Sequence, residues 1–542
     1  MANNDINPKQ SIEIKGSEKP SPQGDKLATI NHNESIEITV RVRRKKSIEP
    51  ILDHAKTYSH QEYEKEFGAS QEDIDLIEKF ASQHHLSVAQ INYARRTVLL
   101  KGQMKYFEEA FQIQLDNYQH SNGTVFRGRE GTVQIPAHLE NIIEGVFGLD
   151  NRPVARRRSE SLKMNREDSN LDALYGYTPV EIANAYNFPK NVTGKGQCIG
   201  IIELGGGYRN EDLVDYFAAL NLPMPEIKSV SVGEGINNPT NADSDDGEVV
   251  LDIEVAGAIA PGAKIVVYFA DNTDKGFLDA ITTAIHDTIN KPTVISISWG
   301  YPENIWTSQS LMSFNEAFKA ASLLGITICT SVGDHGSADQ MTNNKFYDGL
   351  AKVDFPASSP FVLACGGTKI DINDGKIVSE VVWNDGNNWA TGGGVSEFFI
   401  KPQYQSATNI PLSVEKKFSG RGLPDVAANA CPVSGYKVLI DGKWDVLGGT
   451  SSVAPLMAGF FALSNEKNNV NAGFINPILY ANPTPFCRNI TTGDNITTLS
   501  KKGYTASDGW NACTGWGVMN DFTPESVKLM GDIHDIFKKA KE

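Results

Sequence analysis

Ser451 lies where a side-chain hydroxyl could act as a nucleophile. The octet GGTSSVAP, residues 448–455, places two glycines shortly before a segment that is predicted to be helical, PLMAGFFALSNE. Glycines there would let a substrate backbone come close to an exposed hydroxyl. A plain turn with Thr450 or Ser451 as the N-cap of the helix is the alternative. The octet alone favours the turn, because capped helix starts are far commoner than active sites.

Glu248 and Asp252 could form a coupled acid pair. They lie four residues apart in the apolar segment DGEVVLDIEVAGAIAPG, so a helix would place them on one face. Two such carboxylates repel each other when exposed and are costly to bury. One could serve as a general base that the other orients. A solvated acidic stripe is the alternative.

Three more candidate residues come at the ends of predicted strands. Asp334 follows ITICTSVG, Glu203 lies in IIELGGGY, and Trp299 lies in SISWG. In a parallel α/β sheet the carboxyl ends of the strands line the ligand site. Taken singly, each residue also has an ordinary interpretation: an Asx turn for Asp334, a loop acid for Glu203, and a core or rim aromatic for Trp299.

The elements that would position these residues belong to one large α/β domain. Continuous apolar, β-branched runs are typical of strands buried on both faces of a parallel sheet. The runs are QCIGIIEL, AKIVVYFA, TVISISWG, ITICTSVG and FVLACGG, and helical segments alternate with them. We therefore predict a doubly wound, mostly parallel sheet in a domain that spans residues 174–542.

The N-terminal third has a different pattern. Residues 1–34 are polar and are predicted to be disordered. Residues 35–150 alternate strands and helices, which indicates a small α+β domain with helices on one face of an antiparallel sheet. Residues 151–173 are basic and poor in large apolar side chains, so we expect an exposed linker that is open to cleavage. A basic patch for a nucleic-acid partner is the alternative there.

Composition argues against several classes of partner. The formal net charge of −16 does not suit a nucleic-acid or anionic membrane surface. We predict no membrane span, because no segment has about 18 consecutive apolar residues, and the N-terminus has no recognisable signal peptide. The six cysteines lack CxxC spacing, so no disulfide framework is required, although Cys487 and Cys513 could pair.

Together, and in this order, the motifs resemble those of the sedolisin family of serine-carboxyl peptidases. They are IIELGGGY, GEVVLDIEVAGAIAPGAKI, SISWG, SVGDHGSAD, VDFPASSPFVLACGGT, GGTSSVAPLMAG and FCRNITTGDN…GWNACTGWG. The likeness covers about residues 175–522 and is greatest to the kumamolisin branch, in which GGTS stands in place of SGTS. It implies a subtilisin-like fold, preceded by a ferredoxin-like α+β activation propeptide.

This resemblance implies a role for each candidate. Ser451 would be the nucleophile, Glu248 the general base and Asp252 the acid that orients Glu248. Asp334 would belong to the oxyanion hole. The hydrogen-bond network behind the acid pair would be extended by two more residues, Glu203 and Trp299.

Such a set implies chemistry at low pH. A glutamate can serve as general base at acidic pH, and Asp334 can donate a hydrogen bond to an oxyanion only when it is protonated. We expect an acid-acting serine endopeptidase made as a zymogen, with peptides or proteins as substrates and its own propeptide as intramolecular inhibitor. We also expect a monomer without an organic cofactor and, by family resemblance, a secreted one.

Two alternatives remain. A subtilisin-type Ser-His-Asp protease has a similar serine motif, but the α/β domain contains only His286, His335 and His534, and none is an evident base. We expect His335, next to Asp334, on a surface loop. The second alternative is a binding protein that kept the sedolisin fold and lost activity. The presence of all four candidate residues, Ser451, Glu248, Asp252 and Asp334, argues against it.

The resemblance further implies a structural calcium site near the C-terminus, where this sequence departs from the family. The family uses two aspartates and several backbone carbonyls. The aligned positions are Asn489, Ile490, Ser507, Gly509 and Asn511, so both carboxylates have become asparagines. Calcium affinity depends on ligand charge, and we therefore expect a weakened or lost site.

Overall fold

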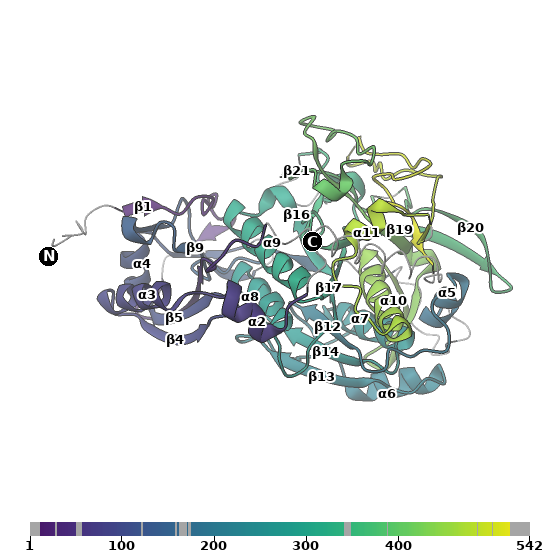
Figure 1. Cartoon of the computed structure of the whole chain (residues 1–542), viewed down its shortest axis with the longest axis horizontal. Helices are drawn as coiled ribbons and strands as arrows, with labels where there is room; N and C mark the ends of the chain where they lie inside the picture. The colour runs from purple at the N-terminus through teal and green to yellow at the C-terminus, as the bar shows by residue number, and fades with distance from the viewer. Residues whose placement is uncertain are drawn as a thin grey trace, which may run out of the picture.

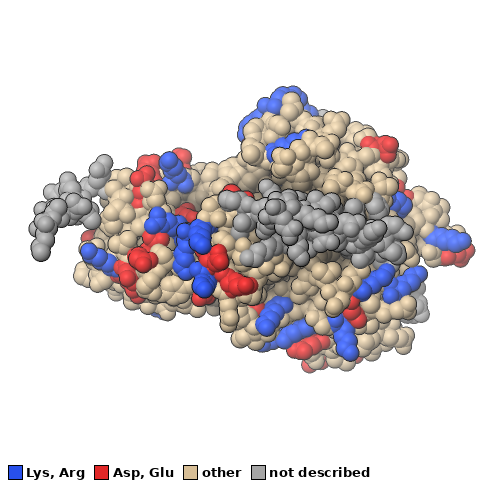
Figure 2. Space-filling model, viewed as in Figure 1, with Lys and Arg blue, Asp and Glu red and all other residues tan. Residues whose placement is uncertain are grey.

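The computed structural model describes residues 11–27, 30–49, 57–120, 123–157, 160–161, 171, 175–340, 348–386, 388–484, 486–500 and 502–520. A smaller N-terminal part lies against one side of a larger part (Figure 1). On the face shown in Figure 2, acidic and basic side chains lie side by side over the smaller part.

The smaller part is built on a four-stranded antiparallel sheet in the order β4-β5-β3-β9. Its elements are β3 (Ser35–Val42), α3 (Gln71–Gln83), β4 (Ser87–Asn92), β5 (Thr97–Gln103), α4 (Met104–Phe111) and β9 (Ile143–Phe147). Both the order along the chain and the order in space are those of a ferredoxin-like βαββαβ unit. The predicted α+β propeptide fold is therefore confirmed.

Strand β3 shows why this sheet needs the larger part. Its apolar side chains Ile38 and Val40 are fully buried in the core of the small sheet. The polar side chains Thr39 and Arg41, which alternate with them, are buried as well, on the opposite face. Thr39 Oγ1, for example, donates to Asp279 Oδ2 of the larger part at 3.0 Å.

The prediction of disorder over residues 1–34 is wrong for residues 11–27. Strand β1 (Ser11–Glu13) pairs with β8 (Gln134–Pro136). Strand β2 (Asp25–Lys26) pairs with β6 (Asp116–Gln119), which also pairs with β7 (Val125–Gly128). These edge strands are held by backbone hydrogen bonds and need no apolar run, so composition did not reveal them. Residues 1–10 lie outside the described part.

The larger part contains a ten-stranded sheet in the order β13-β14-β12-β15-β17-β19-β23-β27-β26, with β20 beside β19. All pairs are parallel except β19 with β20 and β26 with β27. The strands are β12 (Cys198–Glu203), β13 (Glu226–Ser231), β14 (Lys264–Phe269), β15 (Val294–Ile297), β17 (Thr327–Ser331), β19 (Leu363–Asn373), β20 (Lys376–Val382), β23 (Val426–Asn429), β26 (Cys487–Arg488) and β27 (Val518–Met519). The predicted mostly parallel sheet is confirmed.

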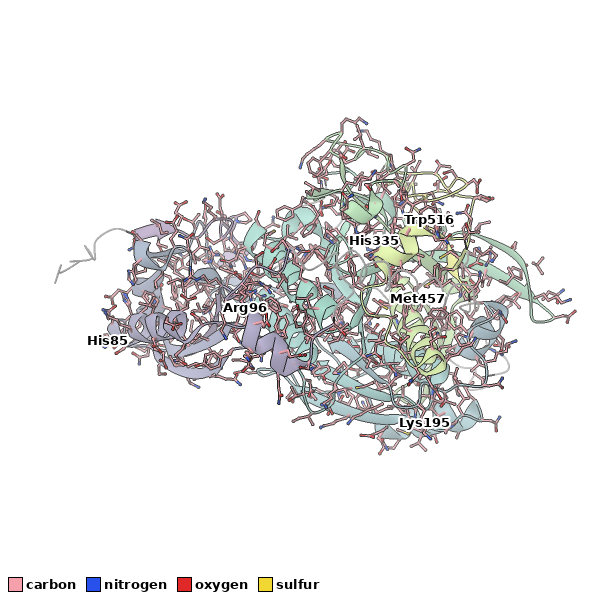
Figure 3. The ribbon with its side chains drawn as sticks, in the orientation of Figure 1. His85, Arg96, Lys195, His335, Met457 and Trp516 are labelled. Carbon is pink, nitrogen blue, oxygen red and sulfur yellow. The ribbon has the colours of Figure 1, made fainter. Side chains whose placement is uncertain are left out.

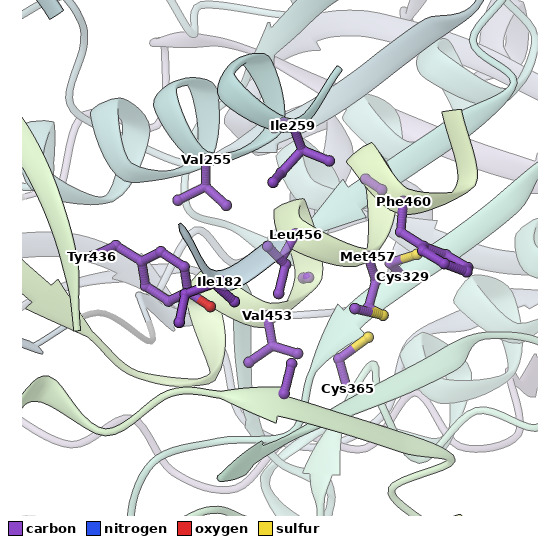
Figure 4. Packing of buried hydrophobic residues seen from close by; sticks show 14 of the residues in the cluster. Ile182, Val255, Ile259, Cys329, Cys365, Tyr436, Val453, Leu456, Met457 and Phe460 are labelled. Carbon is purple, nitrogen blue, oxygen red and sulfur yellow. The ribbon is translucent and has the colours of Figure 1, made fainter. Parts of the chain in front are cut away.

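Helices contribute to two separate hydrophobic clusters around this sheet, as a doubly wound fold requires. One cluster contains α7 (Asp246–Ile259) and α10 (Val453–Asn468), and the other contains α8 (Asp274–Ile285) and α9 (Ser308–Leu323). The remaining helices of the larger part are α5 (Pro179–Ala185), α6 (Asn210–Ala219) and α11 (Asn476–Ala481). Figure 4 shows Val255 and Ile259 of α7 near Leu456 and Met457 of α10.

A glycine brings α7 and α10 together. A Cβ at Gly459 of α10 would lie 2.7 Å from Ile259 Cβ, so a larger residue there would push the two helices apart. Helix α7 carries Glu248 and Asp252, and α10 begins two residues after Ser451. The close contact between the helices therefore helps to set the position of the two acids relative to the serine.

One hydrophobic cluster is shared between the two parts. Tyr63 and Phe67 of α2 (His60–Phe67) and Phe147 of β9 belong to the same buried cluster as Phe277 of α8 and Phe314 of α9. The smaller part therefore covers apolar surface of the larger part as well as forming ion pairs with it.

All six cysteines are free thiols, so the possible pairing of Cys487 with Cys513 is wrong. Cys513 is buried, and its thiol donates to the carbonyl of Tyr504 at 3.1 Å instead. Within the described ranges, no helix combines the length and apolar character needed to cross a membrane.

Candidate active site

Ser451 lies in a short turn between a strand and a helix. Strand β25 (Lys443–Gly448) leads through Gly449 into the 3-10 turn η7 (Thr450–Ser452), and α10 starts at Val453. Gly449 has φ 112°, in the region that favours glycine. The alternative, in which Thr450 or Ser451 caps the helix, is wrong, because the side chains of both residues bond elsewhere.

Helix α7 carries its acids into the interior. Every residue of the helix is buried, and Glu248, Asp252 and Glu254 have no exposed surface. The solvated acidic stripe is therefore wrong. The helix also contacts the turn that holds Ser451.

Ser298 connects Asp252 to Ser451. Its hydroxyl lies 2.8 and 2.9 Å from the two carboxylate oxygens of Asp252, and its carbonyl accepts a 3.3 Å hydrogen bond from Ser451 Oγ. Sequence analysis did not single out Ser298. The only signal was its place at the same strand end as Trp299.

Glu203 and Trp299 form a hydrogen bond with each other. Trp299, the first residue of β16 (Trp299–Pro302), donates from Nε1 to Glu203 Oε2 at 2.9 Å. Both side chains are buried. The contact joins the carboxyl end of β12 to the segment that follows β15.

The acids are close enough to change one another's protonation. Burial raises the pKa of Glu203 well above its usual range, and the charge of Glu248 raises it further. Burial likewise raises the pKa of Asp252, and the charges of Glu203 and Glu248 add to the effect. Burial and the neighbouring like charges therefore both favour the protonated forms of Glu203 and Asp252.

Asp334 is bound to the turn of the serine. It follows β17, is 1% exposed, and its Oδ1 accepts from both the backbone nitrogen and Oγ1 of Thr450, each at 2.8 Å. The residue directly before Ser451 thus fixes this carboxyl group. The structure therefore brings all four candidates to the region around η7.

His335 is not on the surface, contrary to our expectation. It is 6% exposed, and its ring lies 4.7 Å from the ring of Trp389 in an edge-on arrangement. His335 is labelled in the larger part in Figure 3. The polar glycine-containing loop around it gave no sign that Trp389 would cover it.

Two segments of the predicted linker bind beside the serine as strands. Strand β10 (Arg156–Arg157) runs antiparallel to β16, with Arg157 opposite Trp299. Strand β11 (Glu160–Ser161) runs antiparallel to β25, with Glu160 opposite Gly448. Residues before and after positions 158–159 therefore pair with two different strands next to Ser451, in the extended form of a bound peptide. Positions 158–159, 162–170 and 172–174 of the linker lie outside the described residues.

Gly300 makes room for the residues that pack beside β16 on the side of β18. It lies opposite Arg156 in β16, and a Cβ at this position would come within 2.1 Å of Asp354 Oδ1 and 2.8 Å of the carbonyl of Phe355. Asp354 is fully buried in β18 (Asp354–Phe355), which pairs with the other end of β16. The glycine of SISWG is thus required by packing.

In the C-terminal segment, two asparagine side chains contact backbone oxygens. Asn489 Nδ2 donates to the carbonyl of Gly509 at 2.6 Å. Asn511 Nδ2 donates to the carbonyls of Ile490 and Ser507 at 3.1 and 3.3 Å. These are the backbone oxygens that the family resemblance assigned to calcium, and an amide nitrogen now faces them. In the part of the chain that the structure describes, no group of three or more His, Cys, Asp or Glu residues is arranged to hold a metal ion.

Each of the two parts of the chain matches a known protein family. Residues 26–152 match the model "Pro-kumamolisin, activation domain", and residues 233–477 match the model of the subtilase family. The chain is 45% identical to kumamolisin of Bacillus sp. (strain MN-32) over 496 residues, which cover 88% of each protein. It is 29% identical to sedolisin of Pseudomonas sp. (strain 101) over 384 residues, 67% of this chain and 63% of that protein. A solved structure of Pseudomonas sedolisin, a serine-carboxyl proteinase in complex with pseudo-iodotyrostatin, is similar with a TM-score of 0.57 and 28% identity over 66% of this chain and 99% of that one.

Proposed function

Because this chain belongs to the sedolisin family of serine-carboxyl peptidases and carries a pro-kumamolisin activation domain, we propose that it is an acid-acting endopeptidase zymogen that cuts its own linker. The observation that carries the proposal is the pairing of β10 and β11 with strands beside Ser451. The family resemblance also favours a site of action outside the cell.

In the proposed reaction, Ser451 Oγ attacks the carbonyl carbon of the scissile peptide bond while Glu248 accepts the hydroxyl proton. Asp252 holds Glu248 in position, and its own place is fixed by Ser298. Protonated Asp334 donates a hydrogen bond to the oxyanion. Glu248 then returns the proton to the leaving amine, and water releases the acyl group by the same steps in reverse order.

The environment of the acids supports a working range at low pH. Raised pKa values for Glu203 and Asp252 keep protons in the cluster, so Glu248 has acidic neighbours that can share one. Among the described residues, no histidine forms a hydrogen bond with Ser451, and the ring of His335 packs against the ring of Trp389. A Ser-His-Asp mechanism therefore has no support from this geometry.

The docking of the propeptide also depends on ionised acids. Arg44 of the propeptide binds Glu316 of α9 at 2.5 Å, and Arg95 binds Asp279 of α8 at 3.2 Å. Burial alone would raise the pKa of Glu316, but Arg44 and Lys319 lower it below its usual value. A carboxyl group with a lowered pKa contributes stability that is present above its unbound pKa of about 4.3 and is lost as pH falls through the bound value. Acidification thus weakens the docking.

Glu316→Gln should imitate protonation at this interface. Breaking a largely buried ion pair costs about 3 kcal/mol, so the variant should be processed at a higher pH than wild type, with the midpoint shifted upward by about one unit. The fraction of cut chain after a fixed time, measured by intact mass across a pH series, gives the midpoint. Glu37→Gln, which removes an acid from the exposed pair with Lys101 inside the propeptide, is the control and should leave the midpoint unchanged. Equal midpoints for all three proteins would contradict this role of the ion pair.

A catalytically inactive binding protein would keep the same fold and the same linker strands. Hydrolysis of a denatured protein at about pH 4 separates the two functions, since only a peptidase produces new termini. Fragments that appear after the propeptide has been cut support the peptidase. If the denatured protein yields no fragments, whether or not the linker of the chain itself has been cut, the result would support the binding protein.

We also propose that the C-terminal segment is closed by amides in place of calcium. The amide groups of Asn489 and Asn511 already bind the carbonyls that would be ligands. Excess calcium or a chelator should therefore change the melting temperature by less than about 1 °C. In the double variant Asn489→Asp/Asn511→Asp, millimolar calcium should raise it by several degrees. A large rise for the wild-type chain at micromolar calcium would refute the proposal.

A further inference from the structure

Strand β10 brings two arginine side chains to the larger part beside Ser451. Arg156 and Arg157 lie before positions 158–159 of the linker, whereas β11 lies after them, so a cut between the two strands would leave both arginines on the acyl side. Each of the two arginines contacts a separate group of the larger part. These contacts involve none of the residues that carry out the proposed reaction.

Arg157 is held at the start of α7. Its Nη1 donates to the carbonyl of Ser244, and its Nε lies 3.6 Å from Asp245 Oδ1. A carbonyl and a carboxylate together satisfy a guanidinium group better than either does alone.

Arg156 uses a different kind of contact. Its guanidinium group lies over the ring of Tyr301, 4.9 Å from the ring centre, in a cation–π arrangement. Tyr301 is the third residue of β16, the strand with which β10 pairs. The two neighbouring arginines, whose side chains point to opposite faces of the extended strand, are therefore both recognised.

We infer that Asp245 and Tyr301 are specificity-determining residues, which make this site selective for peptides with two consecutive basic residues on the acyl side of the cut bond. The inference rests on the proposed peptidase function and names its substrate class. The linker would then be cut at its run of arginines because these arginines are the side chains that the site selects.

Hydrogen exchange of the full-length chain tests the contact without any need for activity. In a Ser451→Ala background, Asp245→Asn should increase the exchange rate of the backbone amides at residues 154–157 by about tenfold. Asp215→Asn removes the same charge from an exposed residue of α6 and should leave these rates unchanged. Equal protection in the Asp245 and Asp215 variants would overturn the assignment, whether or not the chain is a peptidase.

Hydrolysis of quenched fluorescent peptides tests the selectivity itself. The peptides are PVARRRSESLK, which copies residues 153–163, and versions with alanine in place of Arg156 or Arg157. Activated wild type should cleave the parent about tenfold faster, in kcat/KM, than the peptide without Arg157. The ratio should fall towards one in Asp245→Asn and recover in Asp245→Glu. Tyr301→Leu should lower the corresponding ratio of kcat/KM between the parent and the peptide without Arg156. Tyr301→Phe keeps the ring and should preserve that ratio.

The outcomes distinguish the inference from the function beneath it. Cleavage of all three peptides at one rate by wild type would overturn the selectivity and leave the peptidase intact. If no peptide is cleaved by the wild type, the proposed function fails, and the exchange experiment still decides whether Asp245 holds Arg157.

Discussion

Ser451→Ala is expected to leave the full chain uncut at about pH 4 and to lower hydrolysis of a denatured protein by about a millionfold, to the background level. Loss of the hydroxyl removes the atom that attacks the carbonyl, and no other hydroxyl takes its place. The fold should be preserved, because Ser451 Oγ makes one long hydrogen bond, at 3.3 Å to Ser298. Intact mass spectrometry measures the processing, and the release of peptides measures the hydrolysis.

Ser452→Ala provides the matched control for this variant. Ser452 is equally buried in the same turn, but its hydroxyl donates to the carbonyl of Gly449 at 2.7 Å and lies 3.4 Å from the carbonyl of Asn429. We expect this variant to cost about 1 kcal/mol of stability and to process normally. If the Ser451 variant is cut as fast as the Ser452 variant, cleavage of the linker is not the work of Ser451.

Glu248→Gln should have the second largest effect, a loss of at least about 10⁴-fold in hydrolysis. Glutamine has the shape of glutamate but cannot accept the proton of Ser451. The control is Glu254→Gln in the same buried helix. Glu254 Oε2 accepts a hydrogen bond from the backbone nitrogen of Leu439 at 3.0 Å, and glutamine can keep that bond. Hydrolysis by the Glu254 variant should therefore stay within about threefold of wild type. Similar losses in both variants would mean that α7 is needed only for the fold.

Glu248→Gln should also change how the stability of the fold depends on pH. A carboxyl group with a raised pKa stabilises the fold fully below its unfolded value of about 4, and this contribution is lost as pH rises through the folded value. Glu203 and Asp252 both behave in this way, partly because of Glu248. In a Ser451→Ala background, Glu248→Gln should therefore raise the melting temperature at pH 7 more than at pH 4. Calorimetry at the two pH values checks the sign, and a larger rise at pH 4 would contradict the coupling.

The central sheet could be predicted from the sequence because its strands are continuous apolar runs. Strands such as β12 and β15 are buried on both faces, so local composition and burial agree. Strands β1 and β2 could not be predicted, because short edge strands depend on partners more than 90 residues away. The same holds for His335, which is buried by Trp389 across more than 50 residues of chain.

The candidate site could be predicted as a set of residues but not as a network. Glu248 and Asp252 have a helical spacing that a single segment reveals, and the roles of Ser451 and Asp334 came from resemblance to a family. Ser298 and Thr450 were missed as partners of these acids, because a serine or threonine hydroxyl leaves no pattern in the sequence until the fold gives it a neighbour. The contacts of Arg157 were missed for the same reason.

The hydrophobic cluster that Tyr63, Phe67 and Phe147 share with α8 and α9 has a consequence for what happens after the linker is cut. In the intact chain the propeptide is tethered, and its effective concentration at the docking surface is of the order of millimolar. Cleavage removes the tether but not the contacts, so docking becomes a bimolecular equilibrium that follows mass action. The released enzyme should then be inhibited in concentrated solution and free in dilute solution, and its activity per molecule should rise on dilution.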